Sequence, residues 1–427
     1  MLPWLNRDLT LLIVAQGLYS FTIGYLPIIL PLYLAALGFG PVALGLLMTA
    51  CAVSSAIFAV IAGVLSVRVG CKKVIIGSSL LIALGCLAFG RSRSFSWLLI
   101  CGALSVIAPQ ATSGSGVGIG PYYPASQALA AEKVRDSDRT HAFATIALIS
   151  GLVAALGSLL AKIPLLLQHA AGFSIVAGYQ FMFGVTAALN VMIALLTTPI
   201  SETDRTRAAG QDAVRTNEVI TVSLLKRQLG LSRESWSLVW RFMFTNWING
   251  LAAGMLGPFV SYWFYRRFGA TADQLATLFF LINLVVAAPL FMAAFLARRF
   301  GAVNVVVGAR GVSALLLLAV PLMPSFLLAG AMYLGRQVIN ALAVPVRQSY
   351  VMGVVRPSER AAAAAVANLP IQGGSSMSSA AAGYLMSNVA LAAPFEVSAI
   401  LQMLNTVVYH LFFHGRPPAE ESPRKGY

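Results

Sequence analysis

Of the residues in this sequence, Arg336 gives the clearest indication of a binding site. It lies about eleven positions into an apolar stretch that begins at Phe326, or roughly 15 Å at 1.5 Å per residue. That depth is near the middle of a bilayer core about 30 Å thick. A guanidinium there must meet a cavity, a carbonyl or an anion. Three interpretations stay open for Arg336: contact with a substrate anion, a structural bond to backbone or amide groups, and a shallower depth.

Neutral polar side chains in the apolar stretches could complete a binding site around Arg336. Asn340 shares its helix face at i, i+4. Gln372 lies between Pro370 and two glycines, a combination that can loosen a helix beside a cavity. Hydrogen bonding that only joins helices is an equal alternative. The candidate substrate-binding residues are Arg336, Gln337, Asn340, Gln16, Tyr19, Tyr25, Asn246, Asn249 and Gln372.

Acidic residues are scarce and lie away from the middles of the apolar stretches. Asp273 and Glu396 fall near stretch ends, and this lack of a central carboxylate argues against a cation antiporter. Arg310 is expected to snorkel to the aqueous edge of its stretch. The four cysteines are expected to be small buried hydrophobes, and nothing predicts a metal or a cofactor.

Membrane-crossing helices must position these residues, because the composition excludes most other classes. Hydrophobic residues make up 58% of the 427 residues and charged residues 10%, against about 25% charged in soluble proteins. The mean hydropathy is +0.81. A helix needs roughly 20 apolar residues to cross a bilayer. Twelve such stretches occur: 9–37, 41–66, 73–90, 96–131, 140–163, 174–199, 236–264, 272–296, 303–320, 326–352, 360–386 and 392–414.

The stretches predict an all-α polytopic membrane protein with 12 transmembrane helices in two pseudo-symmetric six-helix bundles. Residues 1–200 and 236–414 form the predicted bundles, and a cytoplasmic central loop, 201–235, separates them. A flexible cytoplasmic tail is expected at 415–427.

Basic residues predict the orientation of the chain. Lys and Arg total 29 and Asp and Glu 14, which gives a net charge of +15. Twenty-two of the basic residues, Arg347 among them, fall on the side of both termini, and five fall on the opposite side. This asymmetry predicts that both termini lie in the cytoplasm. The expected membrane is the plasma or inner membrane. The asymmetry also removes nucleic acid as a partner, while membrane lipids remain one.

An internal repeat relates the two halves. An offset of 231 residues pairs Gly38 with Gly269, Arg68 with Arg299, and Gly70 with Gly301. Farther on, an offset of 221 aligns 134–139 with 355–360. The glycine-rich excess in the first half makes residues 105–120 either a broken fourth helix or an outer loop. Parallel repeats of this kind occur in one large class of secondary transporters.

The loop at 63–73 resembles the signature loop of the major facilitator superfamily, G-x-L-x-D-R-x-G-R-K-x. Its Gly, Leu, Arg, Gly and Lys agree, but Val67 replaces the Asp, and Arg298 replaces it in the second loop. The resemblance implies a cavity lined by helices 1, 4, 7 and 10 and a cytoplasmic charge network. The expected gating residues are Gly63, Arg68, Gly70, Lys73, Arg139, Arg299, Gly301 and Arg360.

The expected function is secondary transport of a small organic solute, a metabolite or a drug, by alternating access. Arg336 and the missing acids favour an anionic or amphipathic solute. Protons or a counter-ion are candidate coupling partners, and a monomer is expected. The alternative is a non-transporting membrane receptor or assembly factor on the same fold. An enzyme is not expected, since no triad or paired carboxylate is visible. Substrate identity, direction and coupling stay open.

Overall fold

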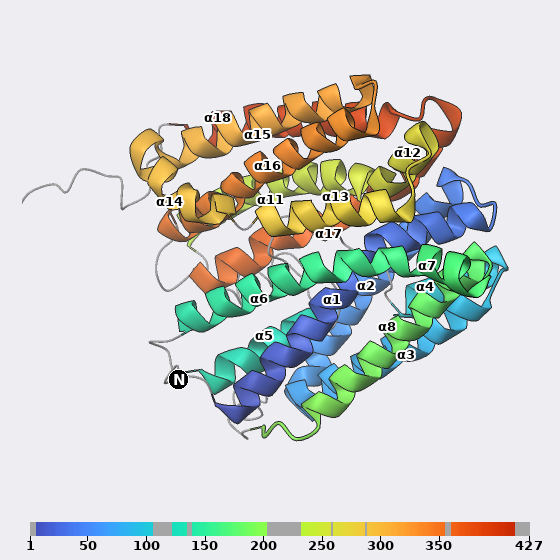
Figure 1. Cartoon of the computed structure of the whole chain (residues 1–427). Coiled ribbons are helices and arrows are strands. Elements are labelled where there is room, and N and C mark those ends of the chain that lie inside the picture. Colours follow the sequence, from blue (N-terminus) through green and yellow to red (C-terminus); the bar gives the residue numbers. More distant parts are fainter. Residues whose placement is uncertain are drawn as a thin grey trace, which may run out of the picture. The chain divides into compact units, whose positions relative to one another are not determined.

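All regular structure in the described part of the chain is helical, because a chain inside lipid must satisfy its own backbone hydrogen bonds. The computed structural model describes residues 6–105, 122–134, 139–202, 232–257, 259–286, 288–354 and 360–414. Contacts divide the chain into two compact units (Figure 1).

The first unit contains the helices of the first half together with two helices from the second half. Its helices are α1 (Arg7–Ala36), α2 (Pro41–Val69), α3 (Cys71–Arg91), α4 (Phe95–Ser105), α5 (Tyr122–Lys133), α6 (Arg139–Leu159), η2 (Leu160–Lys162), α7 (Ile163–Ala171), α8 (Ile175–Thr197), α12 (Phe259–Phe268) and α13 (Ala272–Val285).

The second unit contains most of the second half. Its helices are α11 (Arg233–Leu256), α14 (Ala288–Phe300), α15 (Ala302–Ala319), η3 (Val320–Leu322), α16 (Phe326–Val354), α17 (Arg360–Asn388) and α18 (Ala393–Phe413).

Each of the twelve predicted stretches coincides with one helix or with consecutive helices. Among the described residues, seven helical spans are long and apolar enough to cross a membrane by themselves. The fourth stretch contains α4 and α5, and the segment between them, 106–121, lies outside the described residues. The choice between a broken helix and an outer loop at 105–120 therefore stays open. The predicted bundle boundaries also remain a prediction.

The predicted repeat recurs in the backbone. Gly38 and Gly269 have φ angles of 86° and 64°, and Gly70 and Gly301 have φ angles of 102° and 82°. Both pairs are 231 residues apart, and glycine is the residue that adopts this left-handed region without strain. The second pair precedes α3 and α15 directly. The halves thus share turn geometry as well as sequence.

Close helix packing in each unit depends on glycine. In the first unit α1 packs on α6, and in the second α11 packs on α17 (Figure 1). Gly24 faces the backbone of Gly157, and Gly250 faces the backbone of Ile371. A Cβ atom at Gly374 would lie 2.5 Å from the Trp247 carbonyl oxygen and 2.8 Å from the Leu251 nitrogen. Small residues let membrane helices approach to backbone contact.

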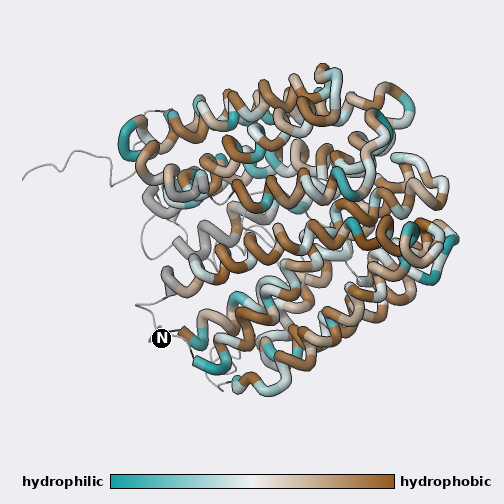
Figure 2. Tube along the Cα trace, viewed as in Figure 1, coloured by the Kyte–Doolittle hydropathy of each residue, from teal (hydrophilic) through white to brown (hydrophobic). Residues whose placement is uncertain are grey.

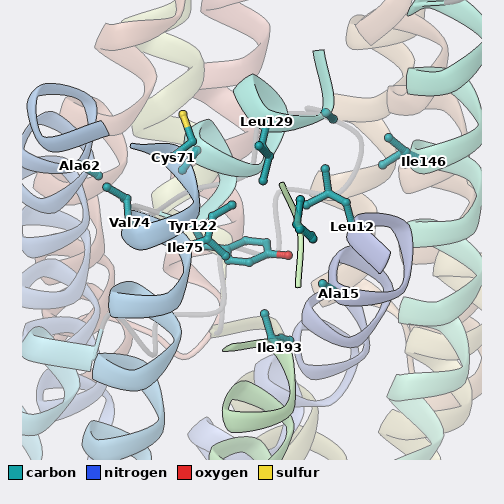
Figure 3. Close-up of a cluster of buried hydrophobic side chains, with 13 residues drawn as sticks. Leu12, Ala15, Ala62, Cys71, Val74, Ile75, Tyr122, Leu129, Ile146 and Ile193 are labelled. Carbon is teal, nitrogen blue, oxygen red and sulfur yellow. The ribbon is translucent and has the colours of Figure 1, made fainter. Parts of the chain in front are cut away.

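Apolar side chains cover the outer surfaces of the helices as well as their contacts. Leu327 and Leu411 are 77% and 71% exposed, which suits a lipid solvent and not an aqueous one. Hydrophobic positions recur along the whole length of most helices (Figure 2). One buried cluster in the first unit gathers Leu12, Ile75, Tyr122 and Ile193 from four different helices (Figure 3).

Candidate functional site: buried arginines of the second unit

Arg336 lies on α16 and is only 7% exposed. Its Nη1 donates a hydrogen bond of 2.6 Å to Gln337 Oε1. Its Cζ lies 5.7 Å from the centroid of the Tyr333 ring, within the range of a cation–π contact. Nε has no hydrogen-bond partner among the described residues. The guanidinium therefore retains a free donor in a buried place.

The other predicted polar residues of the second unit lie on three helices. Gln337 is buried beside Arg336, and Asn340 is half-buried one turn farther along α16. Gln372, on α17, is half-buried, and its Oε1 is a buried acceptor without a donor in the described region. Asn246 and Asn249 lie on one face of α11, but the guanidiniums they bind belong to other arginines.

Arg310 contradicts the expectation that it would snorkel. It is 6% exposed, and its Nη1 donates to Asn249 Oδ1 at 2.9 Å. With the amide of Asn405 turned so that its nitrogen donates to the Thr245 carbonyl, the Asn405 oxygen accepts from the same Nη1 at 2.6 Å. These amides supply acceptors inside the unit, so the side chain does not have to extend to water.

Arg347 is counted in the sequence analysis among the basic residues of the cytoplasmic side, but the structure buries its side chain inside the second unit. Helix α16 continues to Val354, and Arg347 lies within it with 6% exposure. Its Nη1 donates to Asn246 Oδ1, while Asn246 Nδ2 donates to the Ala367 carbonyl at 2.6 Å. The Asn246 amide on α11 thus keeps the Arg347 guanidinium inside the unit. The distribution of charges along one helix does not reveal a partner on another helix.

Carboxylates do not neutralise these arginines in the described part of the chain. The ion pairs found there join Lys133 to Asp8 and Glu132, and Lys162 to Asp273. Arg310, Arg336 and Arg347 are held instead by neutral amide oxygens. Buried cations held only by neutral groups are poorly compensated.

The predicted residues of the first unit join its helices to one another. Gln16 Oε1 accepts a hydrogen bond of 3.3 Å from Ser126 Oγ. The Tyr19 ring stacks on that of Tyr122 with 4.3 Å between centroids. The hydroxyl of Tyr25 shares a hydrogen bond of 2.7 Å with Thr186. Within this unit the three side chains act as links between α1 and its neighbours.

The predicted gating residues are only partly described. Gly70 and Gly301 form the left-handed turns before α3 and α15, and Gly63 lies on an open face of α2. Lys73 and Arg299 are exposed. The side chains of Arg68, Arg139 and Arg360 lie outside the described residues.

Glu202 is a functional candidate that sequence reasoning missed. Its Oε1 accepts hydrogen bonds from the backbone nitrogens of Cys71 at 2.5 Å and Lys72 at 3.4 Å. These are the first N–H groups of α3, where a negative charge meets the positive end of the helix dipole. The signature loop lacks its Asp at Val67, and a carboxylate from beyond α8 lies at the adjoining helix end instead. The substitution of Val for Asp was the one sequence signal that a carboxylate was needed from elsewhere.

Replacing Glu202 with alanine is expected to loosen the start of α3. Charge-assisted hydrogen bonds contribute about 1.5–3 kcal/mol, so the purified protein should melt at a lower temperature. The matched control is Glu396→Ala, which removes an exposed acid from the first turn of α18. Equal melting temperatures for the two variants would show that Glu202 does not stabilise the loop.

Comparison with known proteins identifies the family. The model of the Major Facilitator Superfamily matches residues 12–247 and 242–426. An uncharacterized membrane protein of Saccharomyces cerevisiae, YJR124C, is 23% identical over 383 residues, covering 85% of this chain and 84% of that protein.

Solved transporter structures have the same fold. The nucleoside transporter NupG has a TM-score of 0.71 at 12% identity, covering 96% of this chain and 100% of its own. An auto-inhibited POT family peptide transporter has a TM-score of 0.69 at 13% identity, covering 95% and 96%. A bacterial homologue of the human lysosomal transporter Spinster, in an inward-facing occupied conformation, has a TM-score of 0.67 at 15% identity, covering 95% and 96%. Because the family model spans nearly the whole sequence, the chain belongs to the Major Facilitator Superfamily.

Proposed function

We propose that this protein is a secondary transporter of a small organic anion and works by alternating access. The observation that carries the proposal is the buried guanidinium of Arg336, which has a free Nε donor and no carboxylate bound to it in the described region. An ionisable residue inside a transmembrane segment indicates a functional site by default, and the contacts of Arg336 in the described region are with the neutral groups of Gln337 and Tyr333. Membership of a family of transporters supports the transport reaction.

Arg336 would bind the acid group of the solute, and neutral groups would orient the remainder. Gln337 keeps the guanidinium in place through its hydrogen bond, while Asn340 and Gln372 are half-buried amides of the same unit. The Tyr333 ring beside Arg336 adds an apolar surface, which suits an amphipathic anion. Gln16, Tyr19 and Tyr25 belong to α1 of the first unit, and their contact with the solute stays a prediction from the sequence. Asn246 and Asn249 would act through the arginines that they bind.

Gating would use the loops with left-handed glycines, Gly70 and Gly301, and the basic residues around them. We place both termini in the cytoplasm of a plasma or inner membrane, in line with the distribution of basic residues. Nucleosides and peptides, the substrates named for two proteins of the same fold, differ in charge. Those proteins therefore support transport in general and leave the preference for anions to rest on Arg336.

A ligand screen followed by a flux measurement tests the proposal. Purified protein is melted with organic acids and with their uncharged amide or ester analogues, because a ligand that binds the folded state raises its stability. We expect acids to raise the melting temperature more than their neutral analogues. The best acid is then offered to proteoliposomes, with and without a pH gradient, and saturable uptake is expected. Equal stabilisation by neutral analogues would refute the anion preference, whereas binding without flux would favour a receptor.

A further inference from the structure

Arg310 and Arg347 form a second basic group inside the second unit, apart from the Gln337 and Tyr333 side chains that hold Arg336. Arg310 reaches α11 from α15, and Arg347 reaches it from α16. Their acceptors, Asn249 and Asn246, are three residues apart, which is about 4.5 Å of rise along one helix face. The two guanidiniums are therefore bound to neighbouring turns of the same helix.

The charges of these two arginines are not balanced by the groups that bind them. Each is 6% exposed, and a guanidinium stays protonated in proteins. The acceptors are the neutral amides of Asn246, Asn249 and Asn405. Arg310 is within electrostatic range of Arg347 and also of Arg336. Two buried like charges within electrostatic range of each other are poorly compensated without a counter-charge.

Two buried donors near these charges have no acceptor among the described residues. They are Arg310 Nε and the hydroxyl of Tyr409 on α18. Tyr409 is 2% exposed and lies within electrostatic range of both Arg310 and Arg347. Its ring packs against Tyr350 and Phe413, which form an apolar wall. A desolvated group of donors with positive charge and without acceptors is complementary to a small anion.

We propose that a small inorganic anion of the size and charge of chloride binds between Arg310 and Arg347 and accepts a hydrogen bond from Tyr409. A small ion is favoured because the amides already occupy Nη1 of each guanidinium, and buried aromatic rings close the side formed by α18. The anion stabilises the second unit by neutralising its interior. The occupancy of this site can be measured without knowing the transported solute.

The test is a chloride titration of the purified full-length protein in detergent. Gluconate replaces chloride at constant ionic strength, and the melting temperature is recorded. Wild type should melt several degrees higher in chloride, with saturation. Arg310→Gln and Arg347→Gln should lose this chloride-dependent rise. In gluconate both variants should melt at or above wild type, because each removes an unbalanced buried charge. A purely structural role of these side chains predicts lower melting in both salts.

Arg299→Gln is the matched control, because Arg299 is an exposed arginine of the same unit. It should keep the full chloride response. If an arginine variant does not fold, Tyr409→Phe provides a second test, because it keeps the ring and removes only the hydroxyl. It should raise the half-saturating chloride concentration about three- to tenfold. Superimposed wild-type melts in chloride and gluconate would overturn the proposal. The proposal would also be overturned if Arg310→Gln kept the chloride-dependent rise in melting temperature. It would be overturned as well if acetate raised the melting temperature of the wild type and chloride did not.

Discussion

Replacing Arg336 with glutamine is expected to reduce uptake of the transported anion by about 30-fold or more. Removing one partner of a buried, hydrogen-bonded charge pair costs about 2–5 kcal/mol, and each 1.4 kcal/mol is a factor of ten in affinity. The loss should be largest at low substrate concentration, where binding limits the flux. Initial uptake rates into proteoliposomes measure it, with the amount of reconstituted protein matched.

Two further variants distinguish a binding role from a structural one. Arg336→Lys keeps the charge but not the planar fork of donors, so it should recover part of the uptake. Arg267→Gln alters an exposed arginine of α12 that is not among the expected gating residues, so it should transport like wild type. If Arg336→Gln is folded, as judged by its melting, and transports at the wild-type rate, Arg336 does not bind the solute.

Replacing Gly374 with alanine is expected to force α11 and α17 apart. The added methyl group would lie 2.5 Å and 2.8 Å from backbone atoms of Trp247 and Leu251, and backbone in a packed helix cannot rotate away. Overpacking of this kind costs about 1–3 kcal/mol and sometimes more. We expect a melting temperature several degrees lower and a smaller yield of monodisperse protein after extraction from the membrane.

The neighbouring glycine provides the control for this prediction. A Cβ atom at Gly373 meets no atom within 4 Å, and alanine in a helix is more favourable than glycine by about 0.5–1 kcal/mol. Gly373→Ala should therefore leave the melting temperature unchanged or raise it. Similar melting of the two variants would show that the crossing of α11 and α17 tolerates a wider separation.

Hydropathy along the chain was sufficient to predict the helices. The bilayer sets a minimum apolar length for each crossing, so all twelve stretches coincide with helices even where α11 and α12 divide one of them. The repeat was also predictable, because a left-handed turn needs glycine at Gly70 and at Gly301 alike. Both signals are local in sequence.

Partnerships between distant helices were not predictable. Arg347 binds an asparagine 101 residues away, and Glu202 binds nitrogens 131 and 130 residues away. Periodicity within one helix says nothing about which helix will pack against it. Arg310 and Arg347 were therefore placed at the aqueous edge by rules for isolated helices, whereas acceptors on α11 keep them inside. Arg336 was chosen correctly as buried because its depth alone excludes an escape to water.

The asparagines of α11 have a consequence for biogenesis. An arginine within an isolated transmembrane helix raises the free energy of insertion, by up to about 2.5–3.5 kcal/mol at the helix centre, and α11 binds two such residues, Arg310 of α15 and Arg347 of α16. Helix α11 precedes α15 and α16 in the chain and is synthesised before them. Asn246 and Asn249 are therefore available as acceptors when α15 and α16 insert into the membrane. The order of the helices along the chain thus lets an earlier segment act as a receptor for the charges of later ones.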